Sequence, residues 1–126
     1  MLKKTVTYTD FNGNKRTEEL YFNLTKAELV EMEVGFEGGF KEYCANIAAA
    51  QDMAQVMYFF KDIILNSYGV KSADGKYFIK VDEKGCRLAD KFVQSEAYSE
   101  LFIQMAQEPN AFAEFINGIV PADMAK

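Results

Sequence analysis

The chain contains no histidine and two cysteines, which limits the chemistry that its side chains could perform. Without histidine there can be no Ser-His-Asp or Cys-His nucleophile system and no histidine-ligated metal site. Cys44 and Cys86 lie far apart and form no CxxC pair, and two cysteines cannot build a Cys₄ zinc site. We expect both to be reduced thiols that are buried or half-buried. The sequence therefore predicts no cofactor, no metal and no enzymatic activity.

Two segments bear a partial likeness to ligand-binding loops. Residues 10–14 resemble the start of a calcium loop, but Gly13 follows the second expected ligand directly, and Tyr21 stands where the bidentate glutamate is needed. The glycines of residues 35–39 match neither phosphate-loop pattern, and Glu37 would repel a phosphate. A hairpin turn and a helix–helix connection account for the two segments. Other carboxylates, including Glu28, Glu31 and Glu100, fall on the polar sides of helical stripes, as on a solvated surface.

The formal charge of the chain is −5, from 19 acidic and 14 basic residues. An acidic chain repels the phosphates of nucleic acids, and no run of Lys and Arg exceeds two residues. Neither a nucleic acid nor an anionic membrane is therefore an expected partner. The N-terminal residues lack the apolar stretch of a signal peptide, and no window of about 18 residues is apolar enough to span a bilayer. We expect a cytoplasmic protein.

The chain has the length of one ordinary domain, at 126 residues, and a globular composition that is 49% hydrophobic. We expect a single domain over residues 1–126, with a β-hairpin over 1–24 and a helical body over 25–126. The expected fold class is α+β, mainly α, with the N-terminal β-hairpin packed on a bundle of about five to six helices.

The apolar pattern of the first 24 residues predicts how the hairpin pairs. Val6 and Tyr8 must share a face with Leu20, Phe22 and Leu24 if the hairpin is to cover an apolar surface. A loop over residues 12–14 would place Val6 opposite Leu20 and satisfy this condition, whereas a two-residue turn would place Val6 opposite Glu19. We therefore predict the three-residue loop, with a left-handed residue or bulge near Gly13.

The first helices are predicted from caps and periodicity. Thr25 and Glu28 have the spacing of a capping box, which starts a helix that reaches about Val34. Residues 40–50 favour a second helix. The most apolar helix follows over residues 53–68, and Gly69 would end it as a left-handed cap.

The second half of the chain is predicted to contain three more helices. One covers residues 82–92, one begins after Ser95 as its N-cap, and the last covers residues 110–117. Pro109 suits the first turn of the last helix, and Gly118 would stop it. Residues 77–81 could form a short strand or an extended apolar segment.

Aromatic and methionine side chains are abundant, with eleven Phe, seven Tyr and six Met. They can fill an irregular core, which is the commoner use, or line an adaptable binding surface. The helix over 53–68 is apolar nearly all round, so it lies at the centre of the domain or leaves one face for a partner. The side chains that a single apolar stripe does not bury form our candidate partner surface: Tyr58, Phe59, Phe112, Phe115 and Ile119.

Five phrases are spread, in this order, over nearly the whole length of the chain: residues 4–14 (KTVTYTDFNGN), 22–29 (FNLTKAEL), 71–76 (KSADGK), 95–101 (SEAYSEL) and 115–122 (FINGIVPA). Together they resemble the tail assembly chaperones of long, non-contractile-tailed phages that infect Gram-positive bacteria. This family has no catalytic motif.

The resemblance implies a viral late protein of the host cell cytoplasm that binds the tape measure protein and promotes polymerisation of the major tail (tube) protein around it. Such a chaperone is not retained in the virion. The resemblance also implies possible self-association and, in many members, a longer form made by a ribosomal frameshift, here near residues 119–126. The alternatives are a structural tail-completion or connector protein, which would stay in the virion, and a small enzyme.

Overall fold

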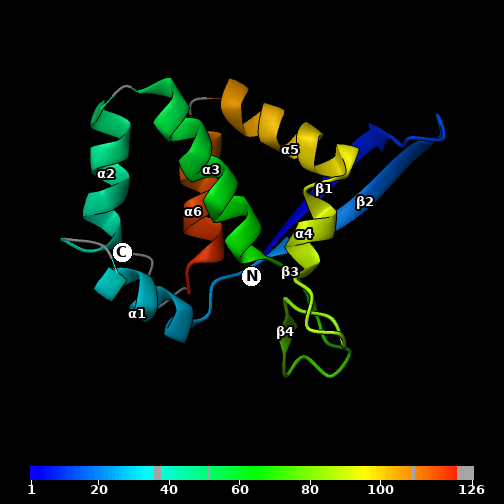
Figure 1. Cartoon of the computed structure of the whole chain (residues 1–126), viewed down its shortest axis with the longest axis horizontal. Helices are drawn as coiled ribbons and strands as arrows, with labels where there is room; N and C mark the ends of the chain where they lie inside the picture. Colours follow the sequence, from blue (N-terminus) through cyan, green and yellow to red (C-terminus); the bar gives the residue numbers. More distant parts are fainter. Residues whose placement is uncertain (36–37, 51, 109, 122–126) are drawn as a thin grey trace.

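The chain forms six helices and a four-stranded antiparallel sheet within residues 1–35, 38–50, 52–108 and 110–121, which the computed structural model describes (Figure 1). The strand order is β1-β2-β3-β4. The expected mixture of helices and strands is therefore present. The strands are β1 (Leu2–Thr9), β2 (Lys15–Phe22), β3 (Tyr68–Lys71) and β4 (Phe78–Ile79), and the helices are α1 (Lys26–Gly35), α2 (Phe40–Ala50), α3 (Met53–Ser67), α4 (Leu88–Phe92), α5 (Glu96–Gln107) and α6 (Ala111–Ile119).

The hairpin has the predicted apolar face, but its register is two residues away from the predicted one. Val6 lies opposite Glu18 rather than Leu20, yet Val6, Leu20 and Phe22 are all buried. A shift of two residues keeps every side chain on its face, so the apolar pattern does not distinguish the two registers. The turn decides between them, because Asp10 Oδ1 accepts the backbone N–H groups of Asn12 and Asn14 at 2.9 Å each. Gly13 is left-handed as expected, with φ of +84°.

The sheet extends beyond the N-terminal hairpin: β3 was not predicted, whereas the short strand considered for residues 77–81 is present as β4. β3 continues directly from α3 and pairs with β2, and β4 pairs with β3. Gly69 is therefore a strand residue and not the left-handed cap that the sequence predicted. A Cβ at Gly69 would lie 2.5 Å from the Phe78 ring and 2.7 Å from the Ile79 carbonyl oxygen, so the close approach of β4 requires glycine.

Side-chain caps start three of the helices. The predicted capping box at α1 is present: Glu28 N–H donates to Thr25 Oγ1 at 3.2 Å, and Thr25 N–H donates to Glu28 Oε1 at 2.9 Å. Ser95 caps α5 as predicted, and Asp52 caps α3.

The helix predicted over residues 82–92 is wrong in its first half. Residues 82–86 form a turn, in which Asp82 Oδ1 accepts the N–H groups of Lys84 and Cys86, and only α4 is helical. The carboxylate of Asp82 binds the local backbone in place of a helical hydrogen bond.

The last helix is longer than predicted, because Gly118 lies inside α6 and does not stop it. Leu2 packs against this glycine, and a Cβ there would lie 2.8 Å from Leu2 Cδ1. Pro109 and the segment after Pro121 lie outside the described residues, as do Gln51 and most of the expected frameshift region.

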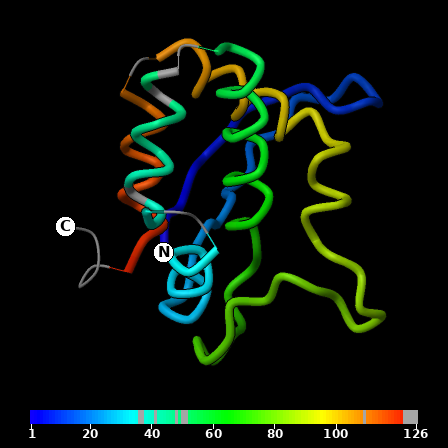
Figure 2. Tube along the Cα trace, turned by 60° about the vertical axis from the view of Figure 1, so that its left-hand side comes forward, coloured from blue at the N-terminus to red at the C-terminus, as the bar shows by residue number. Residues whose placement is uncertain are grey.

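The hydrophobic core lies between the hairpin and the helices. Phe22 of β2 is fully buried, and the Phe115 ring of α6 lies 5.0 Å from it, edge to face. Phe92 of α4 also contacts Phe22, at 6.1 Å between ring centroids. The core therefore joins β2 to α4 and α6. The tip of the hairpin and the β3–β4 region project from this body (Figure 2).

Candidate protein-binding groove

An apolar groove of about 450 Å³ opens among α2, α3 and α6. Native interiors rarely leave apolar space larger than a water molecule, so an open apolar groove of this size is suited to receive a ligand or a partner side chain. The residues that line it are Cys44, Ala45, Ile47, Val56, Phe59, Phe60, Phe112, Ala113, Ile116 and Asn117.

Aromatic rings line this groove and contact one another. The centroid of the Phe112 ring lies 4.0 Å from that of Phe60 and 5.5 Å from that of Phe59, which packs edge to face against it. The Tyr43 ring of α2 also packs edge to face against Phe59, at 5.4 Å between centroids. These contacts hold the rings in place, and the small side chains of Ala45 and Ala113 complete part of the lining.

Two of the five predicted partner residues, Phe59 and Phe112, line the groove. Phe115 and Ile119 are on the same helix as Phe112 but are fully buried in the core, so a partner does not reach them in this conformation. Tyr58 is 71% exposed and does not line the groove. Phe59 lines the groove although only 6% of it is exposed, because the rings of Tyr43 and Phe112 pack against it.

Several lining residues were not among the candidates. Val56 and Phe60 of α3 and Ile116 of α6 are half-buried here. The sequence pattern left open whether the apolar residues of the helix over 53–68 belong to the core or to a partner surface. The sequence shows only that these side chains are aliphatic or aromatic, and this property does not distinguish a residue that lines a groove from one in the core.

Cys44 lines the groove as a half-buried free thiol, as predicted, whereas Cys86 is exposed, contrary to the prediction. Burial, with a smaller contribution from the nearby Glu33 carboxylate, raises the pKa of the Cys44 thiol to about 11. A thiol with this pKa stays protonated at neutral pH and is a poor nucleophile. The groove therefore offers an apolar surface and no reactive group at Cys44.

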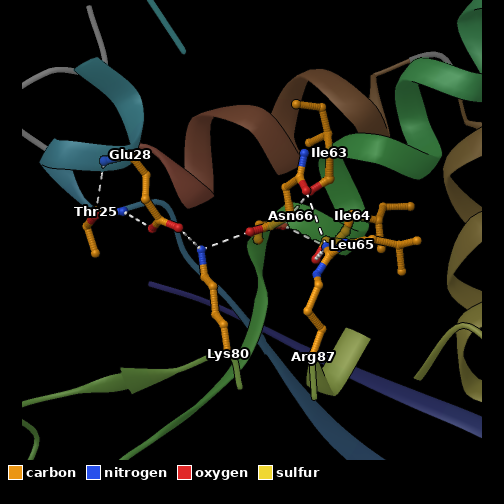
Figure 3. Close-up of polar contacts among 9 residues, drawn as sticks. Thr25, Glu28, Ile63, Ile64, Leu65, Asn66, Lys80 and Arg87 are labelled. Carbon is orange, nitrogen blue, oxygen red and sulfur yellow. Dashed lines mark hydrogen bonds and ion pairs between the residues drawn. The ribbon is translucent and has the colours of Figure 1, made fainter. Parts of the chain in front are cut away.

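A second, more polar cleft of about 490 Å³ lies where α1, the end of α3 and the segment after β4 meet. Lys80, which directly follows β4, donates to Glu28 Oε2 at 2.6 Å and to the Asn66 carbonyl oxygen at 2.8 Å (Figure 3). Burial raises the pKa of the Glu28 carboxyl, but the Lys80 ammonium and the Thr25 N–H oppose this, and the net pKa lies below the usual range. Glu28 is therefore a paired, part-buried carboxylate and not the solvated one that its helical position predicted.

Arg87 approaches the same helix end more loosely. Its guanidinium donates to the Leu65 carbonyl oxygen and to Asn66 Oδ1, at 3.4 Å each. Cations near the C-terminus of α3 complement the partial negative charge of that helix end. In the described part of the chain, no group of His, Cys, Asp and Glu side chains could hold a metal ion, and no helix could cross a membrane.

Comparison with protein-family models finds one for a phage tail assembly chaperone, which matches residues 1–126. No curated protein and no solved structure matches the chain. The match covers the full length, so it includes the hairpin, the groove and the polar cleft.

Proposed function

We propose, because the chain belongs to the phage tail assembly chaperone family, that it binds the tape measure protein and promotes polymerisation of the tail tube around it. The family acts in the host cell during tail assembly and is not a family of enzymes. We place this chain, as a late protein, in the host cell cytoplasm, with the major tail protein as its other partner. In this proposal the chaperone performs no reaction and leaves before the virion is complete.

The groove among α2, α3 and α6 is the observation that supports a protein partner most directly. None of the described residues that line it is charged, and its walls are helices whose rings Phe59, Phe60 and Phe112 are held by mutual contacts. A row of apolar side chains on a partner helix would fill such a groove and cover its rings. We therefore assign Phe59 and Phe112 to direct contact, Tyr58 to its exposed surroundings, and Phe115 and Ile119 to the core beneath.

A charge placed in the groove tests this assignment. Ala113 is exposed at the groove, and Ala106 is exposed on α5 outside it, so Ala113→Glu and Ala106→Glu are matched substitutions in two helices. We expect Ala113→Glu to reduce co-purification of the co-expressed tape measure protein on the order of tenfold, because a carboxylate would be buried by the partner. Ala106→Glu should leave co-purification unchanged.

Equal binding by the two variants would refute the groove as the tape measure site. Failure of the unmodified chain to bind tape measure protein, with or without tube protein, would refute the proposed function. Mass spectrometry of purified virions distinguishes the proposed chaperone from the alternative, a structural protein of the virion. A chaperone is absent from finished particles, whereas a tail-completion or connector protein is present in them.

A further inference from the structure

We propose that the β3–β4 arm, residues 70–87, is a second docking surface, which takes an extended, acidic segment of another protein with apolar side chains at alternate positions. The arm projects from the body below the end of α3 (Figure 1). None of its side chains belongs to the hydrophobic core or packs against it. Packing of the core therefore does not explain why the arm carries exposed apolar side chains.

Four large apolar side chains of the arm are exposed: Val70 by 46%, Tyr77 by 67%, Ile79 by 39% and Val81 by 51%. Val70 lies directly opposite Ile79 in the β3–β4 pair. Tyr77 and Ile79 flank Phe78 in the extended segment, so they project on the side opposite to it, whereas Val81 lies at the edge of the polar cleft with Lys80. An exposed apolar group of this kind is typical of an interaction surface.

The side chains of Phe78 and Lys80 are used within the molecule, since Phe78 lies against Gly69 and Lys80 pairs with Glu28 of α1. β4 is also the outer strand of the sheet. After β4, the Lys80 carbonyl oxygen accepts the Leu88 N–H at 2.9 Å and Val81 bridges to Arg87, so the edge offered to a partner is that of Phe78 and Ile79. An extended partner chain could add to this edge and place alternate side chains over the exposed apolar ones.

The charge of the arm indicates that its partner is acidic. The arm carries five basic and three acidic residues, whereas the whole chain has a formal charge of −5. The carboxylates of Asp74 and Asp82 accept backbone N–H groups of their own turns. Lys76 and Lys84 are exposed, and Arg87 donates only to neutral oxygens in the described part of the chain. An acidic segment complements these cations, whereas a second arm would repel them.

A labelled peptide tests the proposal with the full chain. Fluorescence anisotropy would compare the peptide Glu-Val-Glu-Ile-Glu-Val-Glu with its analogue that carries Lys in place of Glu. Net charge alone favours the lysine peptide, because the chain is acidic. The arm predicts the reverse, with the acidic peptide bound on the order of tenfold more tightly and more weakly as salt is added.

Matched pairs of variants test whether the acidic peptide binds at the arm. Ile79→Ser on the arm and Ile103→Ser on α5 replace isoleucines that are 39% and 48% exposed, and neither belongs to the core. We expect only Ile79→Ser to lower affinity for the acidic peptide by about tenfold. Lys76→Glu should lower it as well, whereas Lys15→Glu, at the foot of the hairpin turn, should not.

Several results would overturn the proposal: tighter binding of the lysine peptide, equal losses with Ile79→Ser and Ile103→Ser, or an RNA oligonucleotide or anionic vesicle preferred to the acidic peptide. A change confined to self-association, measured by light scattering, would assign the arm to contacts between copies and would also overturn it. The groove variant Ala113→Glu should keep peptide binding. The arm and the proposed function can therefore fail separately.

Discussion

The ammonium nitrogen of Lys80 lies 2.6 Å from Glu28 Oε2, and this ion pair joins the segment directly after β4 to the first turn of α1 across 52 residues of sequence. The same carboxylate accepts the Thr25 N–H in the capping box. The arm contributes nothing to the hydrophobic core. Its position on the body therefore depends on this polar contact, on the looser Arg87 contacts and on the short β2–β3–β4 pairing.

Removing the Lys80 ammonium should loosen the arm and leave the body folded. For Lys80→Met we expect amide hydrogen exchange in residues 70–81 to become about fivefold faster, because a part-exposed ion pair contributes at most about 1 kcal/mol. Lys76→Met on the same arm, which removes an exposed ammonium, is the control. Exchange that rises equally in both variants, or throughout the molecule, would contradict this role of Lys80.

The Glu28 contribution to stability should depend on pH. Its pKa is lower in the folded chain than in the unfolded one, so its contribution is complete above the unfolded pKa of about 4.5. It should be lost as the pH falls through the lower, folded pKa. Urea unfolding of the unmodified chain and of Glu28→Gln should therefore differ most at neutral pH and converge in acid. A difference that stays constant from pH 7 to acid would contradict the ionic role.

Gly69→Ala should detach β4 from β3. The new Cβ would lie 2.7 Å from the Ile79 carbonyl oxygen, and this backbone atom can move only if the strand moves. We expect a cost of about 1–3 kcal/mol, which is typical of overpacking, measured by urea unfolding together with exchange in the arm. Gly35→Ala is the matched control, since nothing lies within 4 Å of its Cβ position.

Substitutions of Phe115 and Phe112 should have different effects on stability, although the two residues lie only three positions apart on α6. Phe115 is fully buried against Phe22, so Phe115→Ala should cost about 3–5 kcal/mol in unfolding free energy. Phe112→Ala removes a half-buried ring, so it should cost less and should weaken partner binding in a folded chain. Circular dichroism and co-purification measure the two effects. Equal destabilisation would show that Phe112 is a core residue.

The two thiols should react at different rates. Cys44 is half-buried with a pKa raised to about 11, whereas Cys86 is exposed. At pH 8, iodoacetamide should therefore modify Cys86 first, and the rate at Cys44 should increase as the pH approaches 11. Peptide mass spectrometry would follow both sites. Modification of Cys44 as fast as that of Cys86 would contradict its place in the wall of the groove.

Local patterns predicted much of the fold. The capping box at Thr25 and Glu28, the N-cap at Ser95 and the left-handed Gly13 depend on contacts within a few residues, and all three are confirmed. The predictions that depended on distant parts of the chain were wrong. Gly69 and Gly118 were interpreted as helix ends, whereas Phe78 and Leu2 pack against them from other elements.

The candidate surface shows the same limit. The sequence showed that the helices carry more large apolar side chains than one buried stripe can hold. The packing of α2 and α6 on α3 decided which of these side chains line a groove. It buried Phe115 and Ile119, left Tyr58 exposed and brought Phe59 and Phe112 together. The hydrophobicity of a side chain predicts that it tends to be buried, but only the tertiary contacts decide which neighbours bury it.

The sequence by itself determined which residue types are available: without histidine, no histidine-dependent site can form, whatever the fold. It also determined which side chains of the hairpin share a face, because alternation along a strand is local. The local turn at Asp10 decided the hairpin register, which the alternation alone leaves open because it is unchanged by a shift of two residues. Only the tertiary structure decided the groove and the meeting of Glu28 with Lys80, because local periodicity carries no information about residues so far apart and the packing of whole elements selects these pairs.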